Sequence, residues 1–349
     1  MFNLESHELK TILSTTLIGV VIGTIYTQIA YISRPDADAE LWLGMGIGAT
    51  IGMLITCFEV VFVGRPNSRI RQLPFLLSLV VRAIVHFLTI FFSIYLWQNI
   101  FGIVTGREIV ILSLNSSETT QDFIVSMIIV AIIIFYMQMQ LFIGSRPLRN
   151  LIVGRYNTPR EEQRIFMIID MVGSTEFAQN TGDVVFHQYL NRLFILMDGP
   201  IHRYGGEVHA YVGDAVFAVW PVTNDPEKDA RPLKALADIK ALLEKRSDQI
   251  ENEFGQRPEI RVAVHKGPVA VGETGHRKRQ ITYLGNTVNL ASRIEALTRT
   301  VSGNTLASSE YLGSVQLPDD LLVTELGTFE VKGSSRPLQL SKLERRKSC

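Results

Sequence analysis

The chain has 349 residues with 34 Lys and Arg against 34 Asp and Glu, so its net charge is zero, and 47% of its residues are hydrophobic. The charges are unevenly placed: residues 1–144 hold 7 Lys and Arg and 9 Asp and Glu, whereas residues 145–349 hold 27 and 25. The first part therefore has a membrane composition, and the second is large enough for a globular domain with its own core. Only two cysteines occur, Cys57 and Cys349, which argues against a disulfide framework or a zinc site and predicts a reduced, cytosolic soluble part. No nucleic-acid partner is expected.

Four apolar stretches predict an α-helical transmembrane domain over residues 1–144. Each has about 20 or more residues, enough at 1.5 Å per residue to cross a bilayer core of about 30 Å. Arginines gather between the second and third stretches and after the fourth, which predicts four spans in the inner (plasma) membrane with both termini in the cytoplasm. The stretches cover about 11–32, 41–63, 74–101 and 123–143, and the arginines are Arg65, Arg69, Arg71, Arg146, Arg149 and Arg155.

Three polar residues, Glu59, Arg82 and His86, lie within or near these spans. Charge inside a membrane is costly and usually has a partner or a role. One interpretation is a structural pair of Glu59 with Arg82 that holds two helices together. The other is a sensing role in which His86 binds an unidentified membrane ligand, a proton or a haem.

Residues 145–164 form a junction with two prolines, one glycine and alternating charge, and they show no heptads. The junction is predicted to couple the last span directly to an α+β domain at 165–340, which a flexible basic tail at 341–349 follows. The predicted order βαββαβ, with later strands, indicates a ferredoxin-like fold. Strands are expected at 165–170, 207–211, 214–220, 259–266, 281–284 and near 322–331, and helices at 175–203, 227–251 and 286–299, with a turn-rich segment from 267 to 280.

Two aspartates stand out within this domain. Asp170 ends an apolar run and precedes Gly173, Ser174 and Thr175, whereas Asp214 follows a glycine just before a second apolar run. A strand that delivers a carboxylate to such a turn suits a hard cation and a phosphate, because the turn supplies backbone N–H groups. Two such acids could hold two Mg²⁺ ions about 4 Å apart, the arrangement used in phosphoryl chemistry. The alternative is that each Asp caps a helix or makes a turn.

Other residues also carry chemistry. Asn289 and Arg293 are four residues apart on the predicted helix 286–299, so they point from one face, where an amide and a guanidinium suit an oxyanion. They could equally decorate a solvated face. Lys332 could bring an ammonium to a triphosphate, although this signal is weak by itself.

Four segments resemble the class III nucleotide cyclases, of the membrane-anchored bacterial type. The similarity covers about residues 160–335 and leaves out the membrane half. The four motifs occur in the family's order and spacing. They are Phe166–Thr175, Gly205–Asp214, Arg261–Val269 and Thr282–Arg293.

The resemblance implies a homodimer whose two active sites lie at the subunit interface. Asp170 and Asp214 would bind two Mg²⁺ or Mn²⁺ ions, one activating the ribose 3′-hydroxyl of ATP and the other holding the triphosphate. Asn289 and Arg293 from the other protomer would position the ribose and stabilise the pentavalent transition state, and Lys332 would approach the β- and γ-phosphates. The expected products are cyclic AMP and pyrophosphate.

The resemblance leaves base selection open. Adenylate-specific members usually carry Lys and Asp or Thr at two positions that here are Ala210 and Thr282. Thr282 fits adenine, whereas Ala210 cannot hydrogen-bond to a purine unless His209 or Lys266 substitutes for it. Adenylate is favoured, since the Glu and Cys of guanylate-specific members are absent. The alternatives are a cyclase of relaxed or guanylate specificity, a degenerate dimerising signal module, and a diguanylate cyclase, which Val208 and His209 after Gly205-Gly206-Glu207 disfavour.

Overall fold

The computed structural model divides into two units, Met1–Phe142 and Ile143–Cys349. The described residues are 6–33, 41–64, 68–106, 124–301, 304–330 and 337–345, except 126, 129–130, 137, 140–142 and 278.

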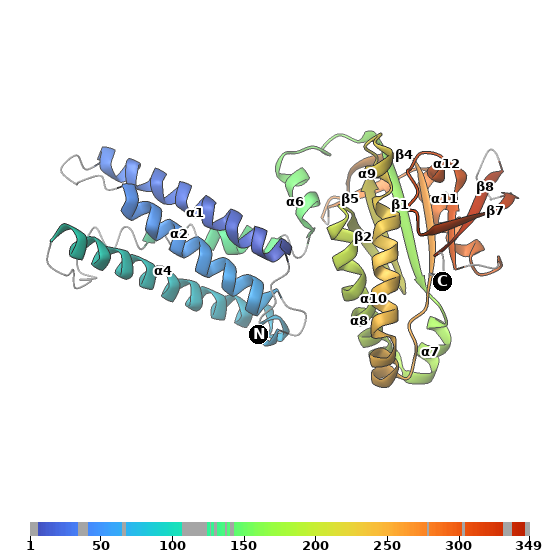
Figure 1. Ribbon diagram of the computed structural model, residues 1–349, viewed down its shortest axis with the longest axis horizontal. Helices are drawn as coiled ribbons and strands as arrows, with labels where there is room; N and C mark the ends of the chain where they lie inside the picture. Colours follow the sequence, from blue (N-terminus) through green and yellow to red (C-terminus); the bar gives the residue numbers. More distant parts are fainter. Residues whose placement is uncertain are drawn as a thin grey trace. The chain divides into compact units, whose positions relative to one another are not determined.

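Long apolar helices dominate the described part of the first unit (Figure 1). Three segments, Thr11–Ile29, Leu41–Val63 and Phe75–Thr105, are long and apolar enough to cross a membrane. The fourth predicted stretch, 123–143, lies partly outside the described residues, and its described positions between 124 and 139 are helical. The elements of this unit are α1 (Ser6–Ser33), α2 (Leu41–Phe58), the π-helix η1 (Glu59–Val63), α3 (Arg69–Gln72) and α4 (Phe75–Thr105).

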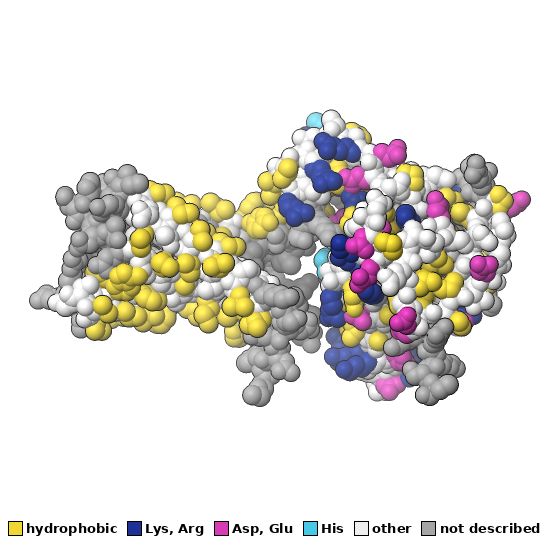
Figure 2. Space-filling view, turned by 45° about the horizontal axis from the view of Figure 1, so that its top comes forward, with side chains coloured by type: hydrophobic (Ala, Val, Ile, Leu, Met, Phe, Trp, Pro, Cys, Tyr) yellow, Lys and Arg dark blue, Asp and Glu magenta, His cyan; other side chains and the backbone are white. Residues whose placement is uncertain are grey.

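Glycines allow α1 and α2 to approach closely. A Cβ built on Gly23 would lie 2.0 Å from the carbonyl oxygen of Gly44, and one built on Gly48 would lie 2.1 Å from that of Gly19. In both helices the glycines are four residues apart, the small-xxx-small pattern of membrane helix pairs. Apolar side chains cover much of this unit's visible face in Figure 2, as expected for a surface in contact with lipid.

The second unit is built on an eight-stranded mixed sheet. Seven strands follow the order β2-β3-β1-β4-β6-β8-β7, and β5 pairs with β4. Only the pair β4–β6 is parallel among the described strands. The strands are β1 (Arg160–Met171), β2 (Glu207–Val212), β3 (Ala215–Pro221), β4 (Ile260–Thr274), β5 (Gln280–Leu284), β6 (Thr305–Ser308), β7 (Leu321–Phe329) and β8 (Leu338–Arg345).

Helices join these strands. Before β1 lies α6 (Ser145–Ile152), and the first crossover holds α7 (Ser174–Thr181) and α8 (Asp183–Arg203). The second crossover holds α9 (Pro226–Asp229) and α10 (Arg231–Phe254), and the later helices are α11 (Asn286–Leu297) and α12 (Ser309–Leu312).

The central strand β1 is buried on both faces. Ile165, Met167 and Ile169 pack in a core with residues of α8 and α10, such as Leu193 and Ile239. The alternate residues Phe166 and Ile168 pack on the other face with Val219, Val271, Tyr283 and Ala291. Burial on both faces explains why this strand is a continuous apolar run in the sequence rather than an alternating one. Each large side chain buried here contributes about 1.5–3 kcal/mol.

Several boundaries differ from those predicted. The helix expected at 175–203 is interrupted at Gly182, whose φ of +83° a helix cannot accommodate. The segment expected to be turn-rich is strand as far as Thr274, because β1 and β5 pair with it. Residues 341–345, placed in the flexible tail, belong to β8 and pair with β6 and β7, so they are ordered by the sheet rather than by their own composition.

Candidate active site

The sheet register brings Asp170 and Asp214 to one place. Ile169 of β1 pairs with Val216 of β3, so the next residue of β1 lies beside the turn that carries Asp214. That turn is a two-residue connection between β2 and β3, and Gly213 at its first position has a φ of +61°. A hairpin of this length favours a residue with positive φ, which glycine adopts without strain.

The electrostatics of Asp170 suit a bound cation. Its carboxyl is 3% exposed. Burial is the largest cause that raises its pKa to about 7, and the negative charges of Asp214 and Glu295 raise the pKa further, whereas Arg299 opposes the rise. A divalent cation at this point would offset both the burial and the repulsion between the carboxylates, so the donor set fits a hard metal ion.

One chain offers few candidate metal ligands at the site of Asp170 and Asp214. Among the described residues no group of three or more His, Cys, Asp or Glu is placed to hold a metal ion. Asp170 and Asp214 would thus supply only part of a coordination sphere, with the rest from phosphate, water or backbone oxygens, as is usual for Mg²⁺.

Arg299 and Glu295 belong to this site although the sequence analysis did not identify them. The Arg299 Nη2 atom lies 3.1 Å from Asp170 Oδ2 and 3.5 Å from Glu295 Oε1. The signal in the sequence was the spacing of four residues between Glu295 and Arg299, shortly after Arg293. An acid and a base at this spacing share a helix face.

The turn after β1 presents a helix start to the same region. Gly173 has a φ of +72° and precedes α7, whose first turn includes Ser174 and Thr175. No side chain caps this helix start. Its free N–H groups and positive dipole end suit phosphate oxygens, and substrate binding by these three residues stays a prediction.

Asn289 and Arg293 lie on α11, which packs against β4 and β1. The hydroxyl of Thr287 anchors the helix start by donating to the Pro268 carbonyl oxygen at 2.7 Å. Asn289 is exposed, and the buried Nη1 atom of Arg293 has no hydrogen-bond partner in the described part of the chain. The structure records no hydrogen bond or ion pair from either residue to Asp170 or Asp214 within the described ranges. Within one chain, Asn289 and Arg293 are therefore not bonded to the two aspartates.

The predicted base-selecting residues lie near Tyr283. Thr282 on β5 shares a hydrogen bond of 2.7 Å with Thr274. The Tyr283 hydroxyl donates to Glu207 Oε1 at 2.8 Å, and the His209 ring meets the Tyr283 ring edge-on at 4.8 Å. The register of β2 with β3 shifts between Val208 and Ala210, which singles out His209 as a bulge residue.

His209 and Lys266 were suggested as substitutes for the lysine that adenylate-specific members usually carry. Of the two, His209 contacts Tyr283, the neighbour of Thr282 in the chain. Lys266 pairs with Ile165, six residues along β4 from Gly272, the partner of Thr282. Lys332 lies outside the described residues.

The first unit holds a second polar cluster. Arg82 donates from Nε to Glu59 Oε1 at 2.9 Å and from Nη2 to Oε2 at 2.7 Å, and His86 Nε2 lies 2.9 Å from the same Oε1. All three side chains are buried. Glu59 begins the π-helix that extends α2, and the His86 Nδ1 atom has no partner in the described residues. The two-point contact joins α4 to the end of α2.

Comparisons with known proteins show the family to which the chain belongs. The family model of the adenylate and guanylate cyclase catalytic domain matches residues 157–342, more than half of the chain. The chain therefore belongs to this family, the class III nucleotide cyclases.

Individual relatives cover the same region. Adenylate cyclase 2 of Rhizobium meliloti is 36% identical over 211 residues, which are 60% of this chain and 58% of that protein. An adenylate cyclase of Mycobacterium tuberculosis is 28% identical over 197 residues, 54% of this chain and 40% of that protein. The chain thus spans about half the length of these curated relatives. A solved bacterial light-regulated adenylyl cyclase has the same fold, with a TM-score of 0.55 and 20% identity over 67% of this chain and 68% of that one.

Proposed function

We propose that this protein is a membrane-bound adenylate cyclase that converts ATP to 3′,5′-cyclic AMP and pyrophosphate. One observation carries the proposal: two features lie next to each other in the chain. Asp170 is buried and repelled by Asp214, and a helix without a side-chain cap begins just after it. The first feature suits divalent metal and the second suits phosphate, and a nucleotide triphosphate with its metal needs both. The 36% identical relative named as an adenylate cyclase supports ATP as the substrate.

In this proposal each side chain has one task. Asp170 and Asp214 hold two Mg²⁺ or Mn²⁺ ions, and the N–H groups of Gly173, Ser174 and Thr175 bind phosphate oxygens. When bound, the ions lower the pKa of the ribose 3′-hydroxyl and neutralise triphosphate charge. The 3′-hydroxyl releases its proton to water as O3′ attacks the α-phosphorus, the bond to the bridging oxygen breaks, and pyrophosphate leaves with that electron pair.

The remaining groups come from a second copy of the chain in a homodimer. Asn289 orients the ribose, and Arg293 stabilises the negative charge that develops on the α-phosphoryl oxygens. The unpartnered Nη1 of Arg293, and the lack of any bond from it to the aspartates among the described residues, support this shared arrangement. Lys332 is proposed to contact the β- and γ-phosphates.

We extend the proposal to the rest of the architecture. Four spans, both termini in the cytoplasm and a location in the inner membrane follow from the arginine distribution. The antiparallel strand order β2-β3-β1-β4, with helices in both crossovers, supports a ferredoxin-like core for the catalytic domain.

Substrate selection is the first property to measure. The purified full-length protein should be given ATP and GTP separately, with Mg²⁺ and with Mn²⁺, and the products identified by mass. We expect cyclic AMP as the main product, with His209 beside Tyr283 compensating for Ala210. Cyclic GMP at a comparable rate would show that Thr282 does not discriminate. A folded dimer without any product would instead support a signalling module.

For the membrane cluster we propose the structural role, in which Glu59 and Arg82 hold α2 and α4 together. The single changes Glu59→Arg and Arg82→Glu each leave an unpaired buried charge and are expected to cost about 3–5 kcal/mol. The exchange of both residues should recover most of this loss, measured as the thermal unfolding midpoint in detergent. Phe92→Ala on the exposed side of α4 is the control, expected to change the midpoint little. An exchange variant as unstable as the singles would favour a ligand at His86.

A further inference from the structure

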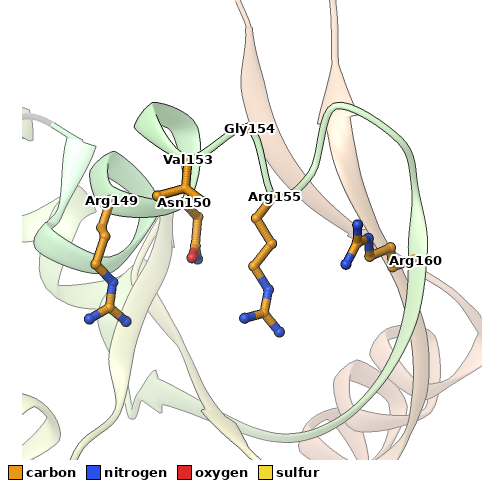
Figure 3. Close-up of a pocket in the computed structure, with 6 residues that line it drawn as sticks. All are labelled: Arg149, Asn150, Val153, Gly154, Arg155 and Arg160. Atoms are coloured by element: carbon orange, nitrogen blue, oxygen red, sulfur yellow. The ribbon is translucent and has the colours of Figure 1, made fainter.

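A basic hollow lies between the end of α6 and the start of β1. Its volume is about 510 Å³, and Figure 3 shows the side chains of Arg149 and Arg155 extending into the same space, with the guanidinium of Arg160 turned toward Arg155. All of the lining residues belong to the second unit. They are Arg149, Asn150, Val153, Gly154, Arg155 and Arg160.

The hollow carries excess positive charge. Three of its six lining residues are arginines and none is acidic. Arg155 pairs with Glu162 at 2.9 Å, but that carboxylate is shared, because Arg164 donates to its other oxygen. Arg149 and Arg160 are exposed and make no ion pair with a described residue. Neighbouring arginines without matching acids repel one another, and an anion between them would relieve this repulsion.

Apolar side chains at the end of α6 face solvent, and one of them, Val153, lines the hollow. Leu151 is 41% exposed, Ile152 66% and Val153 75%, three consecutive positions at the end of α6. A globular protein rarely leaves such a run uncovered, whereas a helix at a membrane surface places apolar side chains in the lipid and arginines among the headgroups. In the sequence α6 begins two residues after the fourth predicted span, so it lies at the membrane boundary if that topology holds.

We propose that this hollow binds the phosphate of an anionic phospholipid headgroup in the cytoplasmic leaflet, an inference that rests on the proposed topology but not on the cyclase reaction. A guanidinium group can bind two phosphate oxygens at once, and three such groups line this hollow together with the amide of Asn150. The acyl chains of such a lipid would then contact the exposed apolar side chains at the end of α6. A cluster of basic residues directly cytoplasmic of a span is typical of anionic lipid recognition.

The test measures how tightly the full-length protein, held in an uncharged detergent, binds the soluble short-chain lipid dihexanoyl phosphatidylglycerol. Binding is measured by isothermal titration calorimetry. The variant Arg149→Gln/Arg155→Gln/Arg160→Gln should bind at least about tenfold more weakly, since each lost arginine removes a charge contact. Its matched control, Lys234→Gln/Lys245→Gln/Arg246→Gln on α10, loses the same charge away from the hollow and should stay within about twofold of the wild type. An equal loss in both variants would overturn the proposal.

Two further measurements distinguish a lipid site from a site for free anions and cover the case in which the triple variant unfolds. Inorganic phosphate is expected to bind at least about tenfold more weakly than the lipid, because it cannot contact Leu151, Ile152 and Val153. Equal affinity would identify a free-anion site and overturn the lipid assignment. Should the triple variant unfold, Arg149→Gln/Arg160→Gln replaces only the two arginines without acidic partners and should still weaken lipid binding. Unchanged binding by that folded variant would refute the proposal.

Discussion

Replacing Asp170 with Asn is expected to abolish cyclase turnover and, at the same time, to stabilise the metal-free protein. Turnover should fall about 10³-fold or more, because Asn lacks the charge that holds a divalent cation. Stability should rise because burial, Asp214 and Glu295 all oppose the charged carboxylate, whose pKa is raised to about 7. Between about pH 4 and pH 7 the folded protein retains a proton that the unfolded chain has released, so the free energy of unfolding falls as the pH rises.

The measurement is thermal unfolding of the wild type and Asp170→Asn at pH 5 and pH 8 in the presence of a chelator. The variant should gain about 1–3 kcal/mol at pH 8 and much less at pH 5. Asp319→Asn is the matched control, since this exposed carboxyl should alter neither turnover nor stability. Asp214→Ala should also abolish turnover. A folded Asp170→Asn or Asp214→Ala protein with wild-type turnover would overturn the metal assignment.

Mixing two inactive variants is expected to restore activity if the active sites are shared. Asp170→Ala lacks a metal ligand and Arg293→Ala lacks the transition-state contact, so a dimer of one copy each contains one site with both groups. With free exchange, half of the dimers are mixed and each has one intact site of two, so about a quarter of the wild-type turnover should return.

The matched control mixes Asp170→Ala with Asp214→Ala. Both aspartates lie together in one chain, so every site in that mixture lacks one metal ligand and no activity should return. Subunit exchange is verified separately with two different affinity tags. If exchange is complete and the first mixture stays inactive, Arg293 does not act across a dimer interface.

The acidic and apolar patterns were enough to predict much of the catalytic region. The apolar run before Asp170 and the glycine before Asp214 predicted strand ends at turns, and β1 and the β2–β3 hairpin have this form. These features are local: a strand needs a run of apolar residues, and a two-residue hairpin favours a residue with positive φ. The glycine repeats of α1 and α2 are equally local, and their spacing of four residues is a signal for close helix packing that length and hydrophobicity alone do not carry.

The sequence by itself therefore determined the division into an apolar first part and a second part that belongs to the cyclase family, because composition and motif spacing report both directly. The catalytic roles of the individual residues stay predictions. Only the tertiary structure decided that Glu295 and Arg299 crowd Asp170, that residues 341–345 are part of the sheet, and that three arginines of the junction line one hollow. The first two of these depend on segments far apart in the chain, such as Asp170 and Arg299, meeting through strand pairing and packing, whereas the hollow depends on the path of the chain between α6 and β1. No local pattern encodes such a contact, since its energy arises only when both partners have been placed by the rest of the fold.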